Sequence, residues 1–197
     1  VLDVEARQFE LVEELDDNVE LPVQVTIASG FPKGDKLEFI TQKVTELGAS
    51  QIWAFPADWS VAKWDGKKLG KKVEKLEKIA LGAAEQSKRN FVPSITLFEK
   101  KADFLAQLSQ FDRIVVAYEE SAKEGESAAL IQAVAGLEKG AELLFIFGPE
   151  GGLSPAEIES FEAKGAVLAG LGPRILRAET APLYALSALS VLLELEK

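Results

Sequence analysis

Two loops near the C-terminus carry residues that could bind a ligand through the peptide backbone. Residues 148–152 read Gly-Pro-Glu-Gly-Gly, and residues 171–182 read Leu-Gly-Pro-Arg-Ile-Leu-Arg-Ala-Glu-Thr-Ala-Pro. Glycine allows other groups to approach the backbone closely, and the free amides at a helix N-terminus favour anions. Each loop follows a predicted strand and precedes a predicted helix. Side by side, the two loops predict one pocket lined by backbone.

The composition excludes several kinds of catalytic chemistry. The 197 residues include no histidine and no cysteine, which excludes a Ser-His-Asp triad, disulfides, thiolate zinc sites and cysteine nucleophiles. The first loop is not a P-loop, because no Gly-Lys-Ser/Thr follows it, and its glycine spacing does not match a dinucleotide fingerprint. The sequence has no aspartate-rich ligand loop, so we expect no metal. Backbone, arginine and carboxylate groups remain to bind or react.

Each loop alone also has a structural interpretation. Residues 148–152 are equally typical of a tight turn between a strand and a helix. In the second loop, Glu179 would lie at the positive end of a helix dipole, and Arg174 would pair with a carboxylate. The presence of both loops in equivalent places favours the shared pocket.

Charge is distributed unevenly along the chain. The net charge is −10, from 32 acidic and 22 basic residues, which argues against general nucleic-acid binding. Residues 63–89 reverse the balance with a run of lysines. These cations form either an ordinary solvated face or a track for RNA phosphates that includes Lys63 and Lys67. Trp59 and Trp64 could stack on bases, although tryptophans near a sheet edge are more often part of the core.

Strand and helix patterns alternate along most of the chain. The predicted strands span residues 23–27, 51–55, 94–98, 113–118, 143–147 and 167–171, and the predicted helices span 35–47, 69–87, 102–108, 127–135, 154–165 and 181–195. Residues 1–20 suggest one or two short strands, and residues 119–126 form an acidic loop. The alternation predicts an α/β fold with a largely parallel sheet covered by helices on both faces. Ligands bind such sheets beyond the C-terminal ends of the strands, where both glycine-bearing loops fall.

The sequence also indicates where the protein acts. It contains no apolar run of membrane-spanning length and no signal peptide, so we expect a cytoplasmic protein without a membrane partner. The chain begins with Val1 rather than methionine. We therefore expect it to be trimmed at its N-terminus.

Several segments resemble one known family. Five segments are similar to the ribosomal RNA small subunit methyltransferase E family: the two glycine-bearing loops 148–152 and 171–182, residues 84–90 (Ala-Glu-Gln-Ser-Lys-Arg-Asn), residues 33–36 (Lys-Gly-Asp-Lys) and residues 45–48 (Thr-Glu-Leu-Gly). The resemblance spans roughly residues 20–197, and the long second loop is its most specific part. One departure is Lys88, which stands where the family usually has glycine.

The resemblance implies a fold and an activity. Members are S-adenosylmethionine-dependent SPOUT enzymes that methylate N3 of a uridine in small-subunit (16S) ribosomal RNA. They have a C-terminal trefoil knot, although general topology rules disfavour knots. They form homodimers with the cofactor pocket near the interface. Residues 1–20 would be a remnant of a PUA-like RNA-binding domain, and residues 21–197 the SPOUT methyltransferase domain, with ribosomal RNA or the subunit containing it as partner.

The resemblance also implies roles for individual residues. Arg89 first, and Arg174 second, would stabilise the uridine anion formed when N3 loses its proton, as an oxyanion hole does. Glu179 would accept that proton or orient an arginine. Gln86, Lys88 and Asn90 would contact the RNA, together with Lys63 and Lys67. The residues expected to bind the cofactor are Phe147, Gly148, Gly152, Leu171, Gly172, Ile175, Leu176 and Arg177.

Three alternatives stay open on the sequence alone. A SPOUT enzyme acting on another RNA or position would bind the same cofactor. A nucleotide-binding oxidoreductase on a doubly wound sheet is disfavoured by the missing fingerprint. A non-catalytic RNA-binding or assembly factor could retain the fold.

Overall fold

The computed structural model describes residues 10, 12–13, 18–118 and 129–195. Most of residues 1–20 and all of the acidic loop 119–126 therefore lie outside the described residues. The described residues before position 21 include no strand. The predicted strands of residues 1–20 and the PUA-like remnant stay predictions.

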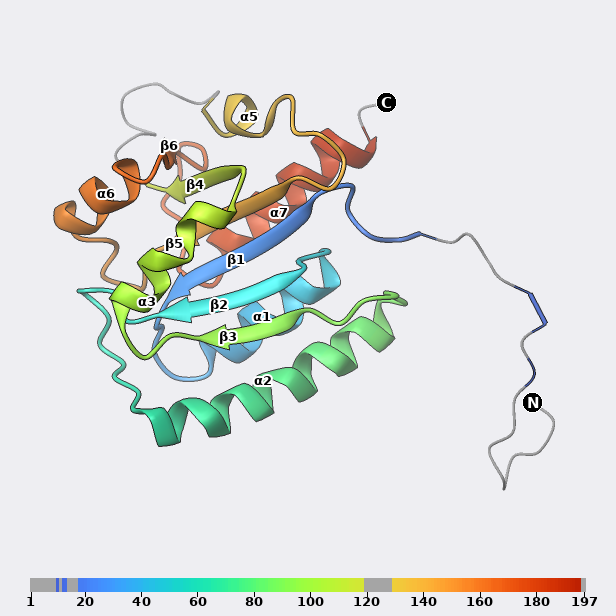
Figure 1. Ribbon diagram of the computed structural model, residues 1–197, viewed down its shortest axis with the longest axis horizontal. Helices are drawn as coiled ribbons and strands as arrows, with labels where there is room; N and C mark the ends of the chain where they lie inside the picture. The colour runs from blue at the N-terminus through green and yellow to red at the C-terminus, as the bar shows by residue number, and fades with distance from the viewer. Residues whose placement is uncertain (1–9, 11, 14–17, 119–128, 196–197) are drawn as a thin grey trace.

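A six-stranded sheet forms the centre of the molecule (Figure 1). Its strands are β1 (Gln24–Gly30), β2 (Gln51–Phe55), β3 (Ser94–Leu97), β4 (Arg113–Ala117), β5 (Glu142–Phe147) and β6 (Val167–Ala169). Their order is β3-β2-β1-β5-β4-β6, and every neighbouring pair is parallel. The predicted α/β fold with a parallel sheet is confirmed.

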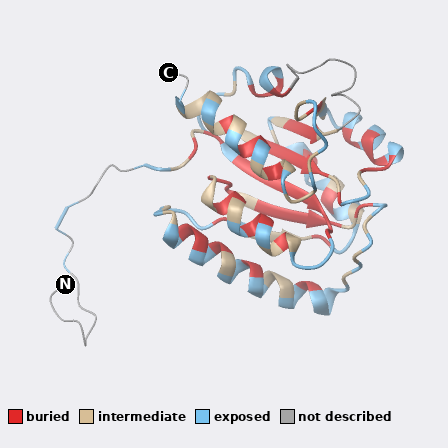
Figure 2. Cartoon of the chain, turned by 180° about the vertical axis from the view of Figure 1, so that it is seen from behind, coloured by how far each residue is buried: buried red, intermediate tan, exposed pale blue. Residues whose placement is uncertain are grey.

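Helices cover both faces of this sheet. They are α1 (Lys36–Glu46), α2 (Gly66–Gln86), α3 (Lys101–Ala106), α5 (Ala129–Val134), α6 (Pro155–Glu162) and α7 (Ala181–Ser190), with short turns η1 (Leu108–Gln110) and η2 (Val191–Leu195). Helices α1, α2, α5 and α7 pack on one face, and α3 and α6 pack on the other (Figures 1 and 2). Side chains alternate between the faces of a strand, so each central strand supplies both cores.

The central strands β1 and β5 are buried almost throughout. Leu143 and Phe145 of β5 face α7 and α1, whereas Leu144 and Ile146 face α3 and α6. A strand enclosed on both faces reads as a continuous apolar run, because neither face meets water. This explains why residues 143–147 form a continuous apolar run in the sequence.

Local capping sets where the helices begin. Helix α6 begins with a capping box: Glu157 N–H donates to Ser154 Oγ at 3.2 Å, and Ser154 N–H donates to Glu157 Oε2 at 2.9 Å. Helix α2 begins three residues earlier than predicted, because Asp65 caps it by accepting from Lys68 N–H at 3.0 Å. Asp35 precedes α1 without a capping side-chain bond.

The parallel arrangement gives the sheet two chemically different edges. All six strands end at the same edge, so the loops that follow them gather there. The segments that lead into the strands gather at the opposite edge. A strand rises about 3.3 Å per residue, so the four central strands, which have five to seven residues, hold the two edges roughly 15–20 Å apart.

Candidate functional site

A cavity of about 710 Å³ lies where β4 and β5 end. Its wall includes residues 147–153 of the first glycine-bearing loop and residues 175–178 of the second. Lys36, Trp59 and Tyr118 also line the cavity. The prediction that the two loops form one pocket is confirmed.

A smaller cavity of about 100 Å³ adjoins the first. The two share Ile175 and Leu176, and the smaller adds Leu171, Gly172 and Arg174. All eight residues expected to bind the cofactor therefore lie at one or both cavities. Three come from the end of β5 and the loop after it, and five come from the loop that precedes α7.

The first loop is folded too tightly for side chains at its glycines. An ideal Cβ placed at Gly148 would lie 2.8 Å from the carbonyl carbon of Gly152, which is closer than Cβ atoms approach other heavy atoms in proteins. Gly152 has a φ of +79°, and its N–H donates to the carbonyl of Pro149 at 2.8 Å. The backbone itself thus forms this part of the cavity wall, as the glycine spacing predicts.

Lys36 joins the two loops through a shared ion pair. Its Nζ lies 2.9 Å from Glu150 Oε1 in the first loop and 3.1 Å from Glu179 Oε2 in the second. The N–H of Lys33 adds a 3.1 Å hydrogen bond to Glu150 Oε1. All three ionic side chains are less than one-third exposed. We call Lys36, Glu150 and Glu179 the loop clamp.

The charges of the loop clamp support one another. The hydrogen bonds to Glu150 and then Glu179 raise the pKa of Lys36 above its usual 10.5. Burial alone would raise the pKa of Glu150, but the bond from Lys36 and bonds from backbone amides lower it. Burial alone would also raise the pKa of Glu179, but a hydrogen bond from a backbone amide and the bond from Lys36 lower it. All three groups are therefore charged at neutral pH.

Arg174 and Arg177 lie on the outer part of the second loop. Arg174 is exposed and lines the smaller cavity, and the side chain of Arg177 is 83% exposed. Arg177 Nη1 lies 4.0 Å from Glu179 Oε1. Of the three residues expected to act in catalysis, Arg174 lines the smaller cavity. Glu179 lines neither cavity but contacts Lys36, which lies in the wall of the larger one.

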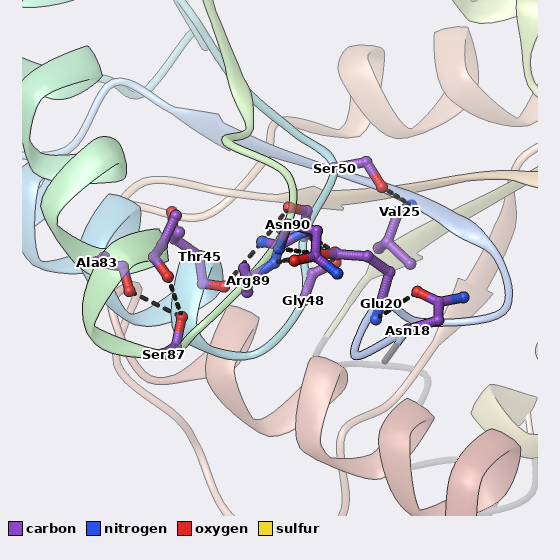
Figure 3. A network of polar contacts seen from close by, with 12 residues as sticks. Asn18, Glu20, Val25, Thr45, Gly48, Ser50, Ala83, Ser87, Arg89 and Asn90 are labelled. Atoms are coloured by element: carbon purple, nitrogen blue, oxygen red, sulfur yellow. Dashed lines mark hydrogen bonds and ion pairs between the residues drawn. The ribbon is translucent and has the colours of Figure 1, made fainter. Parts of the chain in front are cut away.

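The structure does not bring Arg89 to the cavities. Arg89 precedes β3 and so lies at the opposite edge of the sheet. Its Nη1 donates to the carbonyls of Thr45 (2.9 Å) and Ala49 (2.8 Å), and its Nε donates to Glu20 Oε2 at 3.0 Å (Figure 3). Its side chain is only 3% exposed. Within one chain Arg89 is therefore a buried cation away from the cavities, and its expected role on the substrate anion stays a prediction.

The residues expected to contact RNA divide between the two ends of α2. Lys63 and Lys67 are exposed near its start, on the side of the cavity. Gln86, Lys88 and Asn90 lie at its far end beside Arg89, where the N–H of Asn90 donates to Glu20 Oε1 at 3.2 Å. A helix of 21 residues is about 30 Å long, so the two groups cannot contact the same nucleotide.

Sequence reasoning assigned no individual role to Lys36. It appeared only within residues 33–36, one of the segments that carry the family resemblance. The signal that could have found it is its position, directly after the turn that follows β1 and at the same edge as both glycine-bearing loops. A cation there faces two loops that each carry a glutamate.

The described residues contain neither a candidate metal site nor a helix able to span a membrane. No three histidine, cysteine, aspartate or glutamate side chains in residues 18–118 and 129–195 group closely enough to hold a metal ion. No helix in the same part of the chain has the length and apolar character needed to cross a membrane.

Comparison with known sequences gives one consistent family. Residues 19–190 match an RNA methyltransferase domain. Ribosomal RNA small subunit methyltransferase E of Bacillus subtilis is 54% identical over 185 residues, which cover 94% of this chain and 72% of that protein. The protein of the same name from Mesomycoplasma hyopneumoniae is 33% identical and covers 92% of this chain and 76% of its own.

Comparison with solved structures agrees with the sequence match. A crystal structure described as that of a hypothetical protein superposes with a TM-score of 0.86 at 51% identity, covering 94% of this chain and 73% of the other. Ribosomal RNA small subunit methyltransferase E of Neisseria gonorrhoeae, bound to S-adenosyl methionine, has a TM-score of 0.75 at 28% identity and covers 92% and 72% of the two chains. A putative methyltransferase of Legionella pneumophila with bound SAM has the same score and identity, with 90% and 70% covered.

Proposed function

This chain belongs to the ribosomal RNA small subunit methyltransferase E family, and from that premise we propose that it transfers a methyl group from S-adenosylmethionine to N3 of a uridine in small-subunit ribosomal RNA. The family assignment supports the enzyme class, the cofactor and the kind of RNA. Two relatives of known structure hold the cofactor. The assignment disfavours the oxidoreductase alternative. The N3 position rests on the family resemblance.

The cavity suits S-adenosylmethionine in size and in the groups that it offers. Ligand pockets usually measure about 300–1,000 Å³, and this one measures about 710 Å³. Phe147, Ile175 and Leu176 offer apolar surface for an adenine ring, and the tight glycine backbone offers amides and carbonyls for its edge. The loop clamp offers both signs of charge for the amino and carboxylate groups of the cofactor.

The eight residues at the two cavities would hold the cofactor. We assign the adenine and ribose to Phe147, Gly148, Gly152, Leu171, Gly172, Ile175, Leu176 and Arg177. When bound, the cofactor supplies an electrophilic methyl group on a positively charged sulfur. Because this methyl is already reactive, the chain mainly has to align it with the nucleophile.

The chain must also stabilise the uridine as N3 loses its proton. With Arg89 at the opposite edge, Arg174 is the cation that we assign to the negative charge on the flanking carbonyl oxygens. Glu179 is held ionised by Lys36, and its lowered pKa makes it a weak proton acceptor. We therefore assign Glu179 to orienting Lys36 and Arg177, and the N3 proton leaves to water.

We further propose that the chain forms a homodimer through the second loop and α7. Ile175 is 78% exposed, and Tyr184, Val191 and Leu195 on α7 and η2 are also exposed. Apolar side chains that gather beside a cavity are typical of a protein interface. The dimer is tested by the mass in solution, which should be twice 21.3 kDa for this chain.

Four further features stay part of the proposal: the trefoil knot, the PUA-like assignment of residues 1–20, the methyltransferase domain at 21–197 and the cytoplasmic location.

The observation that carries the proposal is the convergence of both glycine-bearing loops on one cavity in a chain of this family. The test is transfer of radiolabelled methyl groups from S-adenosylmethionine to unmodified small ribosomal subunits. Wild-type protein should label the RNA, and Arg174→Ala should lose most of this activity while still binding the cofactor. Cofactor binding without any transfer would instead favour the non-catalytic assembly factor.

A further inference from the structure

Trp59 is the tryptophan that borders the cavity. Its side chain is 49% exposed, and it contributes to the cavity wall. An ideal Cβ at Gly151 would lie 3.0 Å from Trp59 Cβ, and one at Gly152 would lie 3.9 Å from two carbons of the indole ring. The indole therefore packs against the glycine loop, while about half of the residue's surface stays exposed.

The turn that carries Trp59 is fixed from several sides. The N–H of Ser60 closes the turn by donating to the carbonyl of Ala57 at 3.0 Å. Asp58 anchors it: its N–H donates to Glu157 Oε1 at 2.9 Å, and its carboxylate accepts from Ser154 Oγ at 2.6 Å. These bonds tie the loop between β2 and α2 to the start of α6.

Lys101 adds charge to this anchor. It forms ion pairs with Asp58 and, at 3.4 Å, with the buried Glu157. The bond from Lys101, followed by the bond from Ser154, lowers the pKa of Asp58. An aromatic ring on such a turn is preorganised, so little conformational entropy is lost when a ligand stacks on it.

The other two tryptophans serve the core instead. Trp53 is 4% exposed and meets Phe98, Phe104 and Phe111 edge to face. Trp64 lies 4.3 Å from the ring of Phe31 and is covered by the ammonium of Lys72 at 4.3 Å. Core packing thus accounts for Trp53 and Trp64 but leaves the open half of the Trp59 indole unexplained.

The chain that follows Trp59 is basic. Lys63, Lys67 and Lys71 recur every four residues along the same loop and the first turns of α2, and all three are exposed. In a protein of net charge −10, this group marks the side from which a polyanion can approach. A nucleic acid lying on these lysines would have its bases within reach of the cavity.

We propose that Trp59 stacks on the base of the RNA nucleotide that enters the cavity, while Lys63 and Lys67 hold the neighbouring phosphates. This inference rests on the proposed function and names the group that positions its substrate. Enzymes that modify a base take it out of its stack and hold it against aromatic side chains. Trp59 would be a positioning residue, since it places the base without taking part in bond making.

The test compares three substitutions of Trp59 in the full chain. Trp59→Phe keeps an aromatic plane, Trp59→Leu keeps apolar bulk without it, and Trp59→Ala removes both. A stacked base is worth about 5- to 150-fold in affinity, so Trp59→Leu and Trp59→Ala should raise KM for unmodified small subunits by that factor. Trp59→Phe should recover most of the loss, and the Kd for S-adenosylmethionine should stay within twofold. Val61→Ala, at an exposed position of the same loop outside the cavity, is the matched control.

Three outcomes would overturn the inference. Equal KM values for all three variants would make Trp59 a bystander. Weaker binding of S-adenosylmethionine with an unchanged KM for the small subunits would mean that the indole contacts the cofactor instead of the RNA base. Rescue by leucine as complete as by phenylalanine would reduce its role to packing.

A separate readout keeps this inference distinct from the proposed function. Oligouridylate should quench the fluorescence of the wild-type protein more than that of Trp59→Phe, whether or not methyl transfer occurs. Missing methyl transfer with this quenching intact would contradict the proposed function alone. Equal quenching of both proteins would contradict the stacking role alone.

Discussion

The guanidinium of Arg89 is joined to the carboxylate of Glu20 at the edge of the sheet that faces away from the cavities. Glu20 precedes β1, and Arg89 also donates to the carbonyl of Thr45 in the last turn of α1 and to that of Ala49 in the turn before β2. One side chain thus holds three segments together (Figure 3). Arg89 therefore holds the segment that leads into β1 against the sheet.

Replacing Arg89 with alanine should destabilise the fold rather than impair chemistry. Removing one partner of a buried ion pair usually costs about 3–5 kcal/mol, and here backbone carbonyls also lose their donor. We expect a loss of about 3 kcal/mol in the free energy of unfolding, measured with urea. The exposed neighbour Lys88→Ala should change it by less than about 0.5 kcal/mol.

The same variant decides between the structural and catalytic roles. At a temperature where Arg89→Ala is folded, kcat should lie within a few-fold of the wild-type value. Unchanged stability with a hundredfold loss of kcat would restore Arg89 to the catalytic site.

Replacing Lys36 with methionine should weaken cofactor binding more than stability. Methionine keeps the apolar stem but removes the charge that holds Glu150 and Glu179 together, so the two loops repel. We expect about a tenfold rise in the Kd for S-adenosylmethionine, roughly 1.4 kcal/mol, by calorimetry. Lys33→Ala is the control, because Lys33 contacts Glu150 through its backbone N–H. A Kd equally affected by both changes would argue against the loop clamp.

The stability that Lys36 contributes should depend on pH at both extremes. The pKa values of Glu150 and Glu179 are lowered from 4.5, so their contribution is complete above about pH 4.5 and is lost as pH falls through the lowered values. The pKa of Lys36 is raised from 10.5, so its contribution is lost only as pH rises through the raised value. The difference in unfolding free energy between wild type and Lys36→Met should therefore be constant from about pH 5 to pH 9. A maximum within that window would require another titrating group.

One glycine-to-alanine substitution should weaken cofactor binding, and another should stabilise the fold without changing binding. Gly148→Ala places a Cβ 2.8 Å from the backbone of Gly152, so the loop must open and cofactor affinity should fall at least tenfold. Gly82→Ala in α2 meets nothing within 4 Å and should stabilise the helix by about 0.5–1 kcal/mol without changing that affinity. Thermal unfolding with and without S-adenosylmethionine measures both. Normal binding by Gly148→Ala would show that the cofactor does not depend on the tight loop.

The parallel sheet and the shared pocket could be predicted because they follow from local patterns. Apolar runs, caps and the strand–helix alternation fixed the order of elements, and the parallel topology then placed both loops at one edge. The same logic would have excluded Arg89 from the pocket. Arg89 lies between a helix and the strand that follows it, and such residues fall at the opposite edge. The resemblance of residues 84–90 to the family did not by itself show at which edge of the sheet Arg89 lies.

The contacts of Lys36 and of the turn that carries Trp59 could not be predicted from sequence, because their partners are distant along the chain. Lys36 meets Glu150 and Glu179, more than a hundred residues away, and the turn of Trp59 is fixed by Ser154 and Glu157. Charge pairing and hydrogen bonding of this kind depend on tertiary structure.

The most direct test of the central claim is the identity of the methylated nucleoside. Unmodified small ribosomal subunits are incubated with the protein and S-adenosylmethionine, and the RNA is digested and analysed by chromatography and mass spectrometry. We expect 3-methyluridine at one position, and none without cofactor. Methylation of a ribose hydroxyl, of another base or of transfer RNA alone would contradict it.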